Sequence, residues 1–578
     1  MIAVASTLMS LLLAQASGPA SAAASASAPA FSQDGLNALI LIAVYMLILV
    51  LIGCGGSLFS LGTAKDFFTA SHSIGPVLLL FTIFGTTMTA FAIIGSSGEA
   101  YTGGIGVYGK MVSWSGLIHS LCFFLVGIKL WAFGKRYGYQ TQIEFFRDRF
   151  ESHNLGLVLF PALVGLVVPY LLTGLIGGGK AIETMTVGAL PDLFARSKGA
   201  VPFPVGAAAI TFIVLLYVFF GGARGTTWVN VFQTIVFILI GALTFTVIAD
   251  KLGGAKQATA NVAKYNPTFL KIGSGEADQA VFDTQMAQFE AKKSPIKPRE
   301  PERVPPMVFL TYMFIPLSVA MFPHLFQHWL TAKSAKSFRL SVVAHPILMM
   351  LVWLPCVMIG VWATSAMLDG KAVLPQTGVN ANLVLPMMVK KLVSGWQGSL
   401  LIAAIASASI AVLDSQFLAI GSMFTHDIAG HYLGHDRLSD KTKLMIGRGF
   451  IVVIAVATYL LGWYYLQART VFSLGVWCFT GFASLSPIVF AALYWKRATK
   501  AGAYACALTA AGVGLWLCAQ SNWGANADYY VFEQFPIMPV TINLAASTLA
   551  LVLVSLVTPP PSAATIEKFF PRGAAAAK

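Results

Sequence analysis

One acidic residue in an apolar run is the clearest candidate for chemistry in this sequence. Asp414 lies within residues 399–423, a run that otherwise contains no Asp, Glu, Lys or Arg. An ionisable side chain at membrane depth is costly, so by default it is a functional candidate, here as a proton carrier or an ion ligand. A structural carboxylate held by hydrogen bonds is an equally good interpretation.

Other residues that could do chemistry have simpler interpretations. His324 and His328 are four residues apart and could place two imidazoles on one metal, but no Glu occupies the zincin position. We assign them a structural or gating role. Residues 177–180 (Gly-Gly-Gly-Lys) lack the spacing of a phosphate-binding loop, and the six cysteines have no CxxC spacing. We therefore expect no metal site, no cofactor and, without a nucleophile–base pair, no enzymatic activity.

The composition indicates the elements that must position these residues. Of 578 residues, 57% are hydrophobic and only 10% are charged, whereas a soluble chain carries about a quarter charged residues. The apolar residues form separate runs of about 20, the length of a helix that crosses a bilayer. The net charge of +14 comes from basic residues spread over the loops, so the lipid bilayer is the expected surrounding and nucleic acid is not an expected partner.

These runs predict an all-α polytopic membrane protein of about thirteen transmembrane helices. The predicted spans are 36–58, 77–98, 111–133, 155–178, 203–222, 227–250, 307–330, 341–364, 399–423, 446–466, 471–494, 501–519 and 537–558.

Two segments flank these spans, and the basic residues predict their sides. Residues 1–35 are Ala/Ser-rich and form either an external tail or a signal segment. The loops that carry most Lys and Arg fall on one side when the N-terminus is outside, and basic loops stay in the cytoplasm. The odd number of spans then places the C-terminal tail, residues 559–578, in the cytoplasm.

Two spans contain residues that interrupt helices. The second span contains residues 85–89 (Gly-Thr-Thr-Met-Thr) and 95–98 (Gly-Ser-Ser-Gly), and the seventh contains Pro316 and Pro323. Backbone groups freed at membrane depth persist only where protein or a water-filled cavity satisfies them. The two spans are five apart, as in transporters whose discontinuous helices build a binding site at the midplane. Ordinary helix packing of Gly and Pro is the alternative interpretation.

A series of short motifs resembles one family of membrane proteins. They are residues 63–68, 98–104, 141–150, 322–334, 414–416, 425–427 and 494–502. In this order and spacing the chain resembles the sodium:solute symporter family, whose members have a LeuT-like core of two inverted five-helix repeats. The resemblance implies a first repeat at 77–250, an external loop at 251–306 and a second repeat at 307–494. The helix at 36–58 and the two helices within 501–558 are then peripheral.

The resemblance also implies a sodium site, and this chain departs from it. Family members hold sodium between the first broken core helix and the eighth core helix, here span 399–423, through two adjacent hydroxyls. Ala411 and Val412 occupy those two positions, and Asn230 stands where the family often has Asp. We expect ordinary sodium coupling to be impaired or absent. Ser407, one helical turn before Ala411, and Asp414 are candidates for a displaced sodium site or a proton site.

The substrate site implied by the family lies near the two broken spans and span 155–178. The candidates are Thr87, Thr89, Phe91, Tyr170, Thr173, Ile315, Ser318 and Val319. For each of them plain helix packing is an even alternative. Some relatives have an aromatic side chain at the positions of Ile315 and Val319, so we expect a different solute here.

The function expected from these observations is secondary transport across the cell (inner) membrane. The solute is a small polar organic molecule, such as a monocarboxylate, and Na⁺, H⁺ or the solute gradient alone supplies the energy. The alternative is a solute sensor on the same fold that acts through a separate signalling partner. No pattern in the chain predicts an oligomeric state.

Overall fold

The computed structural model describes residues 30–571 except 60–61, 71–72, 273–275, 293, 300–304, 435–436, 466–469, 526–528 and 533. Residues 1–29 of the predicted N-terminal tail and 572–578 of the predicted C-terminal tail therefore lie outside the described residues.

Helices cover each of the thirteen predicted apolar runs, because a helix satisfies its own backbone groups where no water is present. The first run forms α2 (Gln33–Gly55). The second is a broken span made of α4 (Pro76–Thr87), η3 (Phe91–Gly95) and α5 (Ser96–Gly103), and the third consists of α6 (Gly106–Tyr108), η4 (Gly109–Ser113), α7 (Trp114–Cys122), η5 (Phe123–Gly127) and α8 (Ile128–Tyr137). The fourth run forms α10 (Leu155–Met185), and the fifth and sixth together form α11 (Phe203–Lys251). The last seven form the broken span α14 (Pro306–Thr311), η8 (Tyr312–Met321) and α15 (Pro323–Thr331), then α16 (Ser337–Ala363), α18 (Gly395–Ile410) with α19 (Leu413–Met423), α21 (Asp440–Tyr465), α22 (Val471–Tyr494), α23 (Lys500–Gln520) and α24 (Pro539–Val557).

Helix α11 accounts for two predicted spans in one element. Its 49 residues rise about 73 Å at 1.5 Å per residue, roughly twice the bilayer core. The helix turns at Gly222, whose backbone has φ 53° and ψ −150°. A Cβ at Gly222 would lie 2.7 Å from the carbonyl oxygen of Phe67. Only glycine tolerates both the left-handed backbone and this contact.

The second predicted span is interrupted within residues 85–89, as the sequence predicted. It is helical again from Phe91 to Gly103. Helix α4 ends at Thr87, Met88 leaves helical geometry with φ −91° and ψ 78°, and the two halves of the span meet at 57°. Residues 95–98, the other predicted interruption, continue as helix in η3 and α5. The hydroxyls of Ser96 and Ser97 donate back to carbonyls of the same span.

The seventh predicted span is interrupted at Pro323 and not at Pro316. Phe322 is extended, with φ −66° and ψ 119°, and the halves meet at 55°. A residue before proline is driven out of helical geometry, which explains the position of this break. Pro316 stays inside η8, a 3₁₀ helix of 10 residues.

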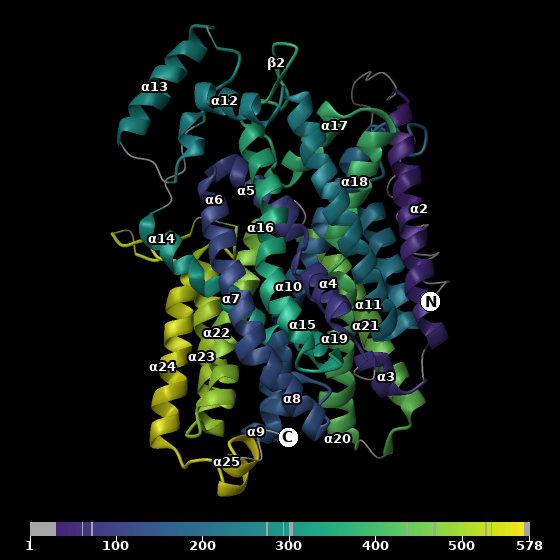
Figure 1. Cartoon of the computed structure of the whole chain (residues 1–578), viewed down its shortest axis with the longest axis vertical. Helices are drawn as coiled ribbons and strands as arrows, with labels where there is room; N and C mark the ends of the chain where they lie inside the picture. Colours follow the sequence, from purple (N-terminus) through teal and green to yellow (C-terminus); the bar gives the residue numbers. More distant parts are fainter. Residues whose placement is uncertain are drawn as a thin grey trace.

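The segments outside the spans gather at two ends of the bundle (Figure 1). One end carries α12 (Ala255–Tyr265), α13 (Glu276–Glu290), the hairpin β1 (Met367–Leu368) and β2 (Lys371–Ala372), and α17 (Val384–Leu392). The other end carries α3 (Ala64–Thr69), α9 (Gln142–Arg149), α20 (His431–Leu433) and α25 (Ala563–Phe569). The long loop at 251–306 is thus partly helical, and so is the tail after residue 559.

Helix α25 packs onto the end of the bundle. The Phe569 ring contacts Phe133, Tyr137 and Phe145 at centroid distances of 5.3, 6.0 and 5.9 Å. Lys568 Nζ lies 2.5 Å from the carboxylate of Asp148 on α9. The C-terminal segment therefore rests on α9 as a docked helix.

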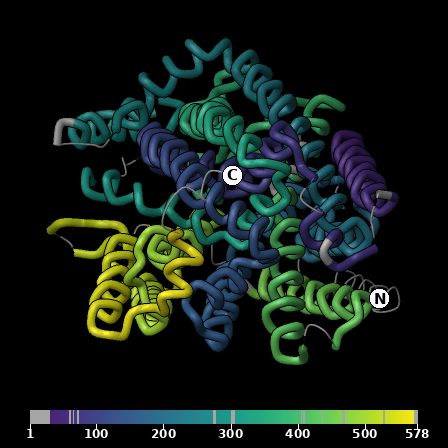
Figure 2. The backbone as a smooth tube through the Cα atoms, turned by 60° about the horizontal axis from the view of Figure 1, so that its bottom comes forward, coloured from purple at the N-terminus to yellow at the C-terminus, as the bar shows by residue number. Residues whose placement is uncertain are grey.

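The peripheral helices lie on opposite sides of the core. Figure 2 shows α2 (purple) at one edge of the bundle and α23 and α24 (yellow-green to yellow) at the opposite edge. Helix α2 packs against α11 and α18, and α24 packs against α22 and α23. The two broken spans lie between these edges, within the core.

Candidate functional site

A small cavity of about 30 Å³ lies between the two broken spans. The side chains that line it come from α4, η3, α7, α10, η8, α16 and α22 and from Phe322 at the second break. They are Thr87, Phe91, Ser115, His119, Tyr170, Tyr312, Ile315, Pro316, Ser318, Phe322, Trp353 and Phe479.

Five of the eight residues proposed for the substrate site line this cavity. They are Thr87, Phe91, Tyr170, Ile315 and Ser318. Both breaks contribute, because Thr87 is the last residue of α4 and Phe322 immediately precedes α15. The two interruptions that are far apart in the sequence therefore face one space.

The other three residues lie behind the cavity wall. Thr89 contacts the phenol of Tyr170, and its hydroxyl accepts a hydrogen bond from the Phe91 backbone nitrogen at 3.1 Å. The Thr173 hydroxyl donates to the carbonyl of Tyr170 at 2.7 Å. Val319 is fully buried in η8. These residues support side chains that line the cavity.

Two polar residues on α7 were missed by sequence reasoning. Ser115 and His119 both line the cavity, four residues apart on one helix face. The Nδ1 atom of His119 is buried with no hydrogen-bond partner in the described structure, as is the indole nitrogen of Trp353 on α16. The i, i+4 pair within an apolar run was the available signal.

Aromatic rings close the cavity toward α22. Phe479 packs against Phe91, Tyr170 and Phe322 at centroid distances of 5.0, 4.9 and 5.5 Å. A volume of about 30 Å³ accommodates roughly two water molecules. An organic solute can therefore enter only if these rings move apart, as gating side chains do.

Ala411 and Val412, predicted to stand where the family has sodium-binding hydroxyls, lie in apolar surroundings. Ala411 and Val412 are fully buried and form the interruption between α18 and α19. Neither side chain offers an oxygen, and hard cations such as Na⁺ require oxygen ligands. The backbone of Ser407 lies in α18, but its side chain is outside the described part of the structure.

Asn230 and Asp414, which lie 184 positions apart, meet in one polar network. Asn230 donates from Nδ2 to the Ser415 hydroxyl at 2.9 Å, and that hydroxyl donates to Asp414 Oδ1 at 3.0 Å. Tyr217 donates from its phenol to Asp414 Oδ2 at 3.1 Å. His328 Nε2 lies 3.1 Å from the Ser415 hydroxyl. We call these five residues, from α11, α15 and α19, the Asp414 network.

The Asp414 network contains no basic side chain other than the imidazole. Asp414 is fully buried, and none of the ion pairs among the described residues includes it. Its oxygens accept from the Tyr217 and Ser415 hydroxyls and from the Ser415 backbone nitrogen, at 2.5 Å for the last, and the Asn230 amide is a further neutral partner. A buried carboxylate with neutral donors alone favours a bound proton or a metal cation.

Unsatisfied amide groups surround the network. Asn230 Oδ1 and both amide atoms of Gln233, three residues along the same face of α11, have no hydrogen-bond partner in the described structure, nor have those of Gln416 on α19. Buried polar atoms normally have partners, including ordered water. Their oxygens are of the type that binds water or a hard cation. Within the described residues, no three His, Cys, Asp or Glu side chains form a metal-binding group.

Comparison with known families gives one match over most of the chain. The model of the "Sodium:solute symporter family" matches residues 67–510. The sodium/proline symporter of Staphylococcus aureus strain USA300 / TCH1516 is 25% identical over 476 residues, which cover 80% of this chain and 82% of the relative. The protein of the same name from strain JH9 is 25% identical over 480 residues, with the same shares.

Comparison with solved structures identifies the fold. A Na⁺-coupled sialic acid symporter, solved in a substrate-bound outward-open state, matches with a TM-score of 0.70 and 16% identity. The match covers 91% of this chain and 99% of that one. The expected LeuT-like architecture of an all-α membrane protein is thereby confirmed.

Proposed function

The chain belongs to the sodium:solute symporter family, and we propose that it carries a small polar organic solute by alternating access. The observation that carries the proposal is the small cavity lined by residues of both broken spans. Discontinuous helices around a midplane site are the structural basis of alternating access in such transporters. The aromatic rings around Phe479 act as the gate over the solute.

The cavity wall supports a compact solute with a polar end. Most of the wall is aromatic or aliphatic, whereas Ser115 and His119 lie together on one helix. The indole N–H of Trp353 can only donate, so it favours an acceptor such as a carboxylate. We propose an amino acid or a short monocarboxylate as the solute class. L-Proline, named in the Staphylococcus aureus relatives, is the first solute to test.

We propose that a proton, bound in the Asp414 network, is the coupling ion. The two positions for sodium hydroxyls are occupied by Ala411 and Val412. The Ser415 hydroxyl joins Asp414 to His328 by hydrogen bonds, and the carboxyl and imidazole groups at the two ends can each bind a proton. No Lys or Arg side chain pairs with the Asp414 carboxylate among the described residues, so a bound proton would neutralise the charge of the network.

A displaced sodium site is the second candidate, and the oxygens of the network favour it. Asp414, Ser415 and Asn230 Oδ1 together supply carboxylate, hydroxyl and amide oxygens, which a hard cation prefers. The two candidates differ in their dependence on external sodium.

We propose the cell (inner) membrane as the location, with the N-terminus outside and the C-terminus in the cytoplasm. Support comes from the grouping of α9, α20 and α25 at one end of the bundle (Figure 1). Arg147, Arg149 and Lys568 belong to these segments, and basic segments remain in the cytoplasm.

Reconstituted protein tests the proposal in two steps. A thermal-shift screen of amino acids and monocarboxylates, with sodium or with choline, finds the solute, because a ligand of the folded state raises its stability. Counterflow of the labelled solute in proteoliposomes then tests transport, and a protein that binds without counterflow is a sensor. Uptake that follows a proton gradient in choline supports the proton site, and uptake abolished in choline overturns it in favour of sodium.

A further inference from the structure

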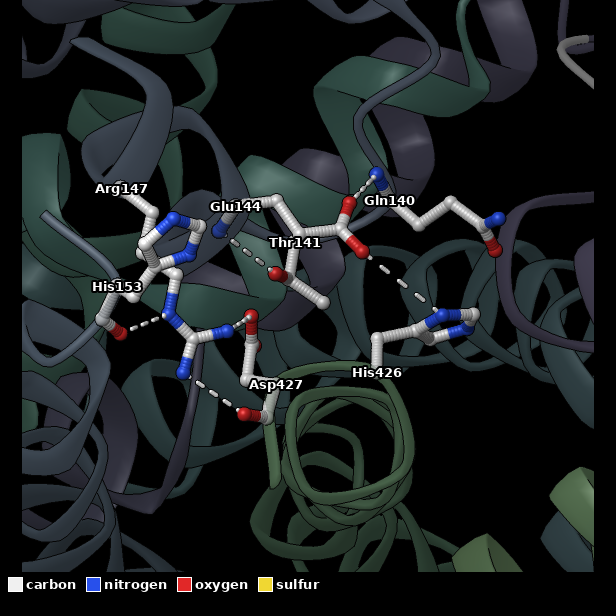
Figure 3. Close-up of polar contacts among 7 residues, drawn as sticks. All are labelled: Gln140, Thr141, Glu144, Arg147, His153, His426 and Asp427. Carbon is white, nitrogen blue, oxygen red and sulfur yellow. Dashed lines mark hydrogen bonds and ion pairs between the residues drawn. The ribbon is translucent and has the colours of Figure 1, made fainter. Parts of the chain in front are cut away.

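A second buried ionic cluster lies at the end of the bundle that carries α9 (Figure 3). Arg147 on α9 donates from Nη2 to the carbonyl of Asp427 at 2.8 Å, and its Nη1 lies 3.4 Å from Asp427 Oδ1. Its Nε donates to the carbonyl of His153 at 3.0 Å. Asp427 belongs to η10 (Phe424–Gly430), the π-helical continuation of α19. Arg147 therefore ties α9 to the end of the ninth span.

Glu144 adds a second carboxylate to this cluster. Its Oε2 accepts from the Gln140 backbone nitrogen at 2.7 Å, and its Oε1 lies 3.9 Å from Nδ1 of His426. His426 precedes Asp427 in η10. Thr141 caps α9 by accepting from the Glu144 backbone nitrogen at 3.2 Å. The cluster therefore consists of two neighbouring pairs, Arg147 with Asp427 and His426 with Glu144 (Figure 3).

The charges of this cluster do not balance without a proton. The cluster holds two carboxylates, Glu144 and Asp427, and one guanidinium, Arg147, and the exposed fractions of these side chains are 21%, 0% and 8%. With a neutral imidazole the sum is one negative charge, which is costly where water is excluded. One proton, on a carboxyl or on His426, restores neutrality. Interacting groups of this kind take up such a proton as a unit.

We propose that Glu144, Asp427 and His426, together with Arg147, form a binding site for one proton that latches the cytoplasmic end closed. The site joins the segment between the third and fourth spans to the end of the ninth span. With the proton bound, the neutral cluster holds α9 against η10. Without it, the surplus negative charge weakens the contact, and this end opens more readily.

The electrostatics of the cluster agree with this geometry. Burial raises the pKa of Glu144, and hydrogen bonds from the backbone of Gln140 and Thr141 and the charge of Arg147 oppose that rise. Burial and the nearby Glu144 raise the pKa of Asp427 well above its usual range, against the effects of Thr141 and Arg147.

The other titratable groups around the cluster have contacts of their own. Tyr139, in the segment before α9, donates to Asp148, and burial raises the pKa of its phenol. The His153 ring stacks on His431 at 5.4 Å, and Tyr432 lies beneath the Arg147 guanidinium at 5.9 Å. The raised carboxyl pKa means that the closed latch binds the proton more tightly than an open one. A low pH on this side therefore favours closure, and closure is lost as the pH rises through the raised pKa.

A cysteine beside the latch reports its opening. Ser422 is 2% exposed and lines a small cavity together with Gln140, Thr141, Gln142 and Gln327. The full-length S422C variant, with the six native cysteines replaced, is reconstituted in nanodiscs and labelled with a small maleimide. Ser439→Cys, at an exposed position, corrects for the pH dependence of thiol reactivity.

The expected result is a pH-dependent labelling rate that disappears when Glu144 cannot titrate. The corrected rate of maleimide labelling at S422C should rise between about pH 6 and about pH 8. The rise is at most about tenfold for each unit by which the pKa of the proton site in the closed conformation exceeds that in the open one. Glu144→Gln keeps the side chain in shape but neutral, so its rate should stay low at both pH values. A flat rate in the parent, or the same rise in E144Q, overturns the proposal.

A second variant keeps the test informative if E144Q folds poorly. Arg147→Lys retains the charge but not the forked geometry, so S422C should label faster than in the parent even at low pH. An unchanged rate in Arg147→Lys counts against the latch. The inference rests on alternating access, but labelling needs no solute and does not involve Asp414. Its failure therefore leaves the proposed transport and coupling untouched.

Discussion

Two fully buried aspartates, Asp414 and Asp427, meet different surroundings in this protein. Asp414, within the ninth span, accepts hydrogen bonds from a phenol, a hydroxyl and a backbone nitrogen. Asp427, at the end of the same helical segment, is held by the guanidinium of Arg147. The first has no Lys or Arg partner among the described residues, and the second is paired with Arg147. The comparison teaches that burial alone does not assign a role to a carboxylate, because the charged and polar groups around it also determine its electrostatics.

The two aspartates also connect different parts of the chain. The Asp414 network joins α11, α15 and α19 at membrane depth, near the broken spans. The Asp427 cluster joins α9 to η10 at one end of the bundle. A change at the first should alter coupling, whereas a change at the second should alter stability and closure.

The largest effect is expected when Asp427 loses its cation. Arg147→Ala leaves a buried carboxylate unpaired, and removal of one partner of a buried pair typically costs about 3–5 kcal/mol. Thermal unfolding in detergent measures the loss. Arg437→Ala, at an exposed position, is the matched control and should stay within about 0.5 kcal/mol of the parent. Equal stabilities of the two variants would contradict the anchoring role of Arg147.

The next effect concerns Asp414, where no cation is lost. Asp414→Asn keeps an oxygen that can accept from Tyr217 and Ser415, so the fold should persist while proton binding ends. A pH difference of about one unit can drive solute accumulation of at most about tenfold in the parent. In the variant the internal solute concentration should only equal the external one, while counterflow of labelled solute should persist.

Tyr217→Phe is the control for this experiment. It removes one hydrogen-bond donor to Asp414 and should lower accumulation only in part. Undiminished accumulation in D414N would assign Asp414 a structural role.

A smaller effect separates two glutamates by the sign of their pH dependence. Burial raises the pKa of Glu144, so its protonation favours the folded state, and this contribution is lost as the pH rises through the raised pKa. For Glu151 burial acts upward, but hydrogen bonds from Ser562 and Thr565 and the charge of Arg149 prevail and lower the pKa. Its contribution is present above the ordinary value of about 4.3 and is lost as the pH falls through the lowered pKa.

Melting temperatures of the two Gln variants check these signs. The melting temperature of E144Q relative to that of the parent should rise by about 2 °C between about pH 5 and about pH 8. The difference for E151Q should change only below about pH 5. Parallel profiles for the two variants would show that the surroundings of Glu144 do not favour its proton.

The smallest effect comes from restoring hydroxyls at the apolar positions beside Asp414. The double variant Ala411→Ser, Val412→Thr should gain a sodium-specific rise in melting temperature that the parent lacks. At a sodium concentration about ten times the dissociation constant, the gain is about 1.4 kcal/mol. Potassium at the same concentration is the control. A sodium-specific rise of equal size in the parent favours the displaced sodium site over the proton site.

Sequence reasoning located the spans because helix length is set by bilayer thickness and is visible in composition alone. It also found both broken spans, since Gly, Thr and Pro alter local backbone preferences. It could not distinguish Pro316, which stays within η8, from Pro323, where the helix breaks. Proline permits a break, but the packing of neighbouring helices determines which one occurs.

The candidate site was predictable where a motif carried it and not elsewhere. Thr87 and Tyr170 were selected by their position on the broken span and its neighbour, and both line the cavity. His119 and Trp353 lie on helices that no motif singled out. Their proximity arises from the packing of α7 against η8 and of α16 against α7, which no local pattern in the chain specifies.

The sequence by itself determined that this chain is a membrane protein of the symporter family. It also predicted about thirteen transmembrane helices and a sodium site in which Ala411, Val412 and Asn230 replace the usual oxygen ligands and carboxylate. Hydropathy, helix-breaking residues and ordered motifs are local properties, so they can be read along the chain. Only the tertiary structure decided that Asn230 and Asp414 share one network and that Arg147 is the partner of Asp427. The charge state of a buried group depends on neighbours that folding brings from distant positions, 280 residues away in the case of Arg147 and Asp427.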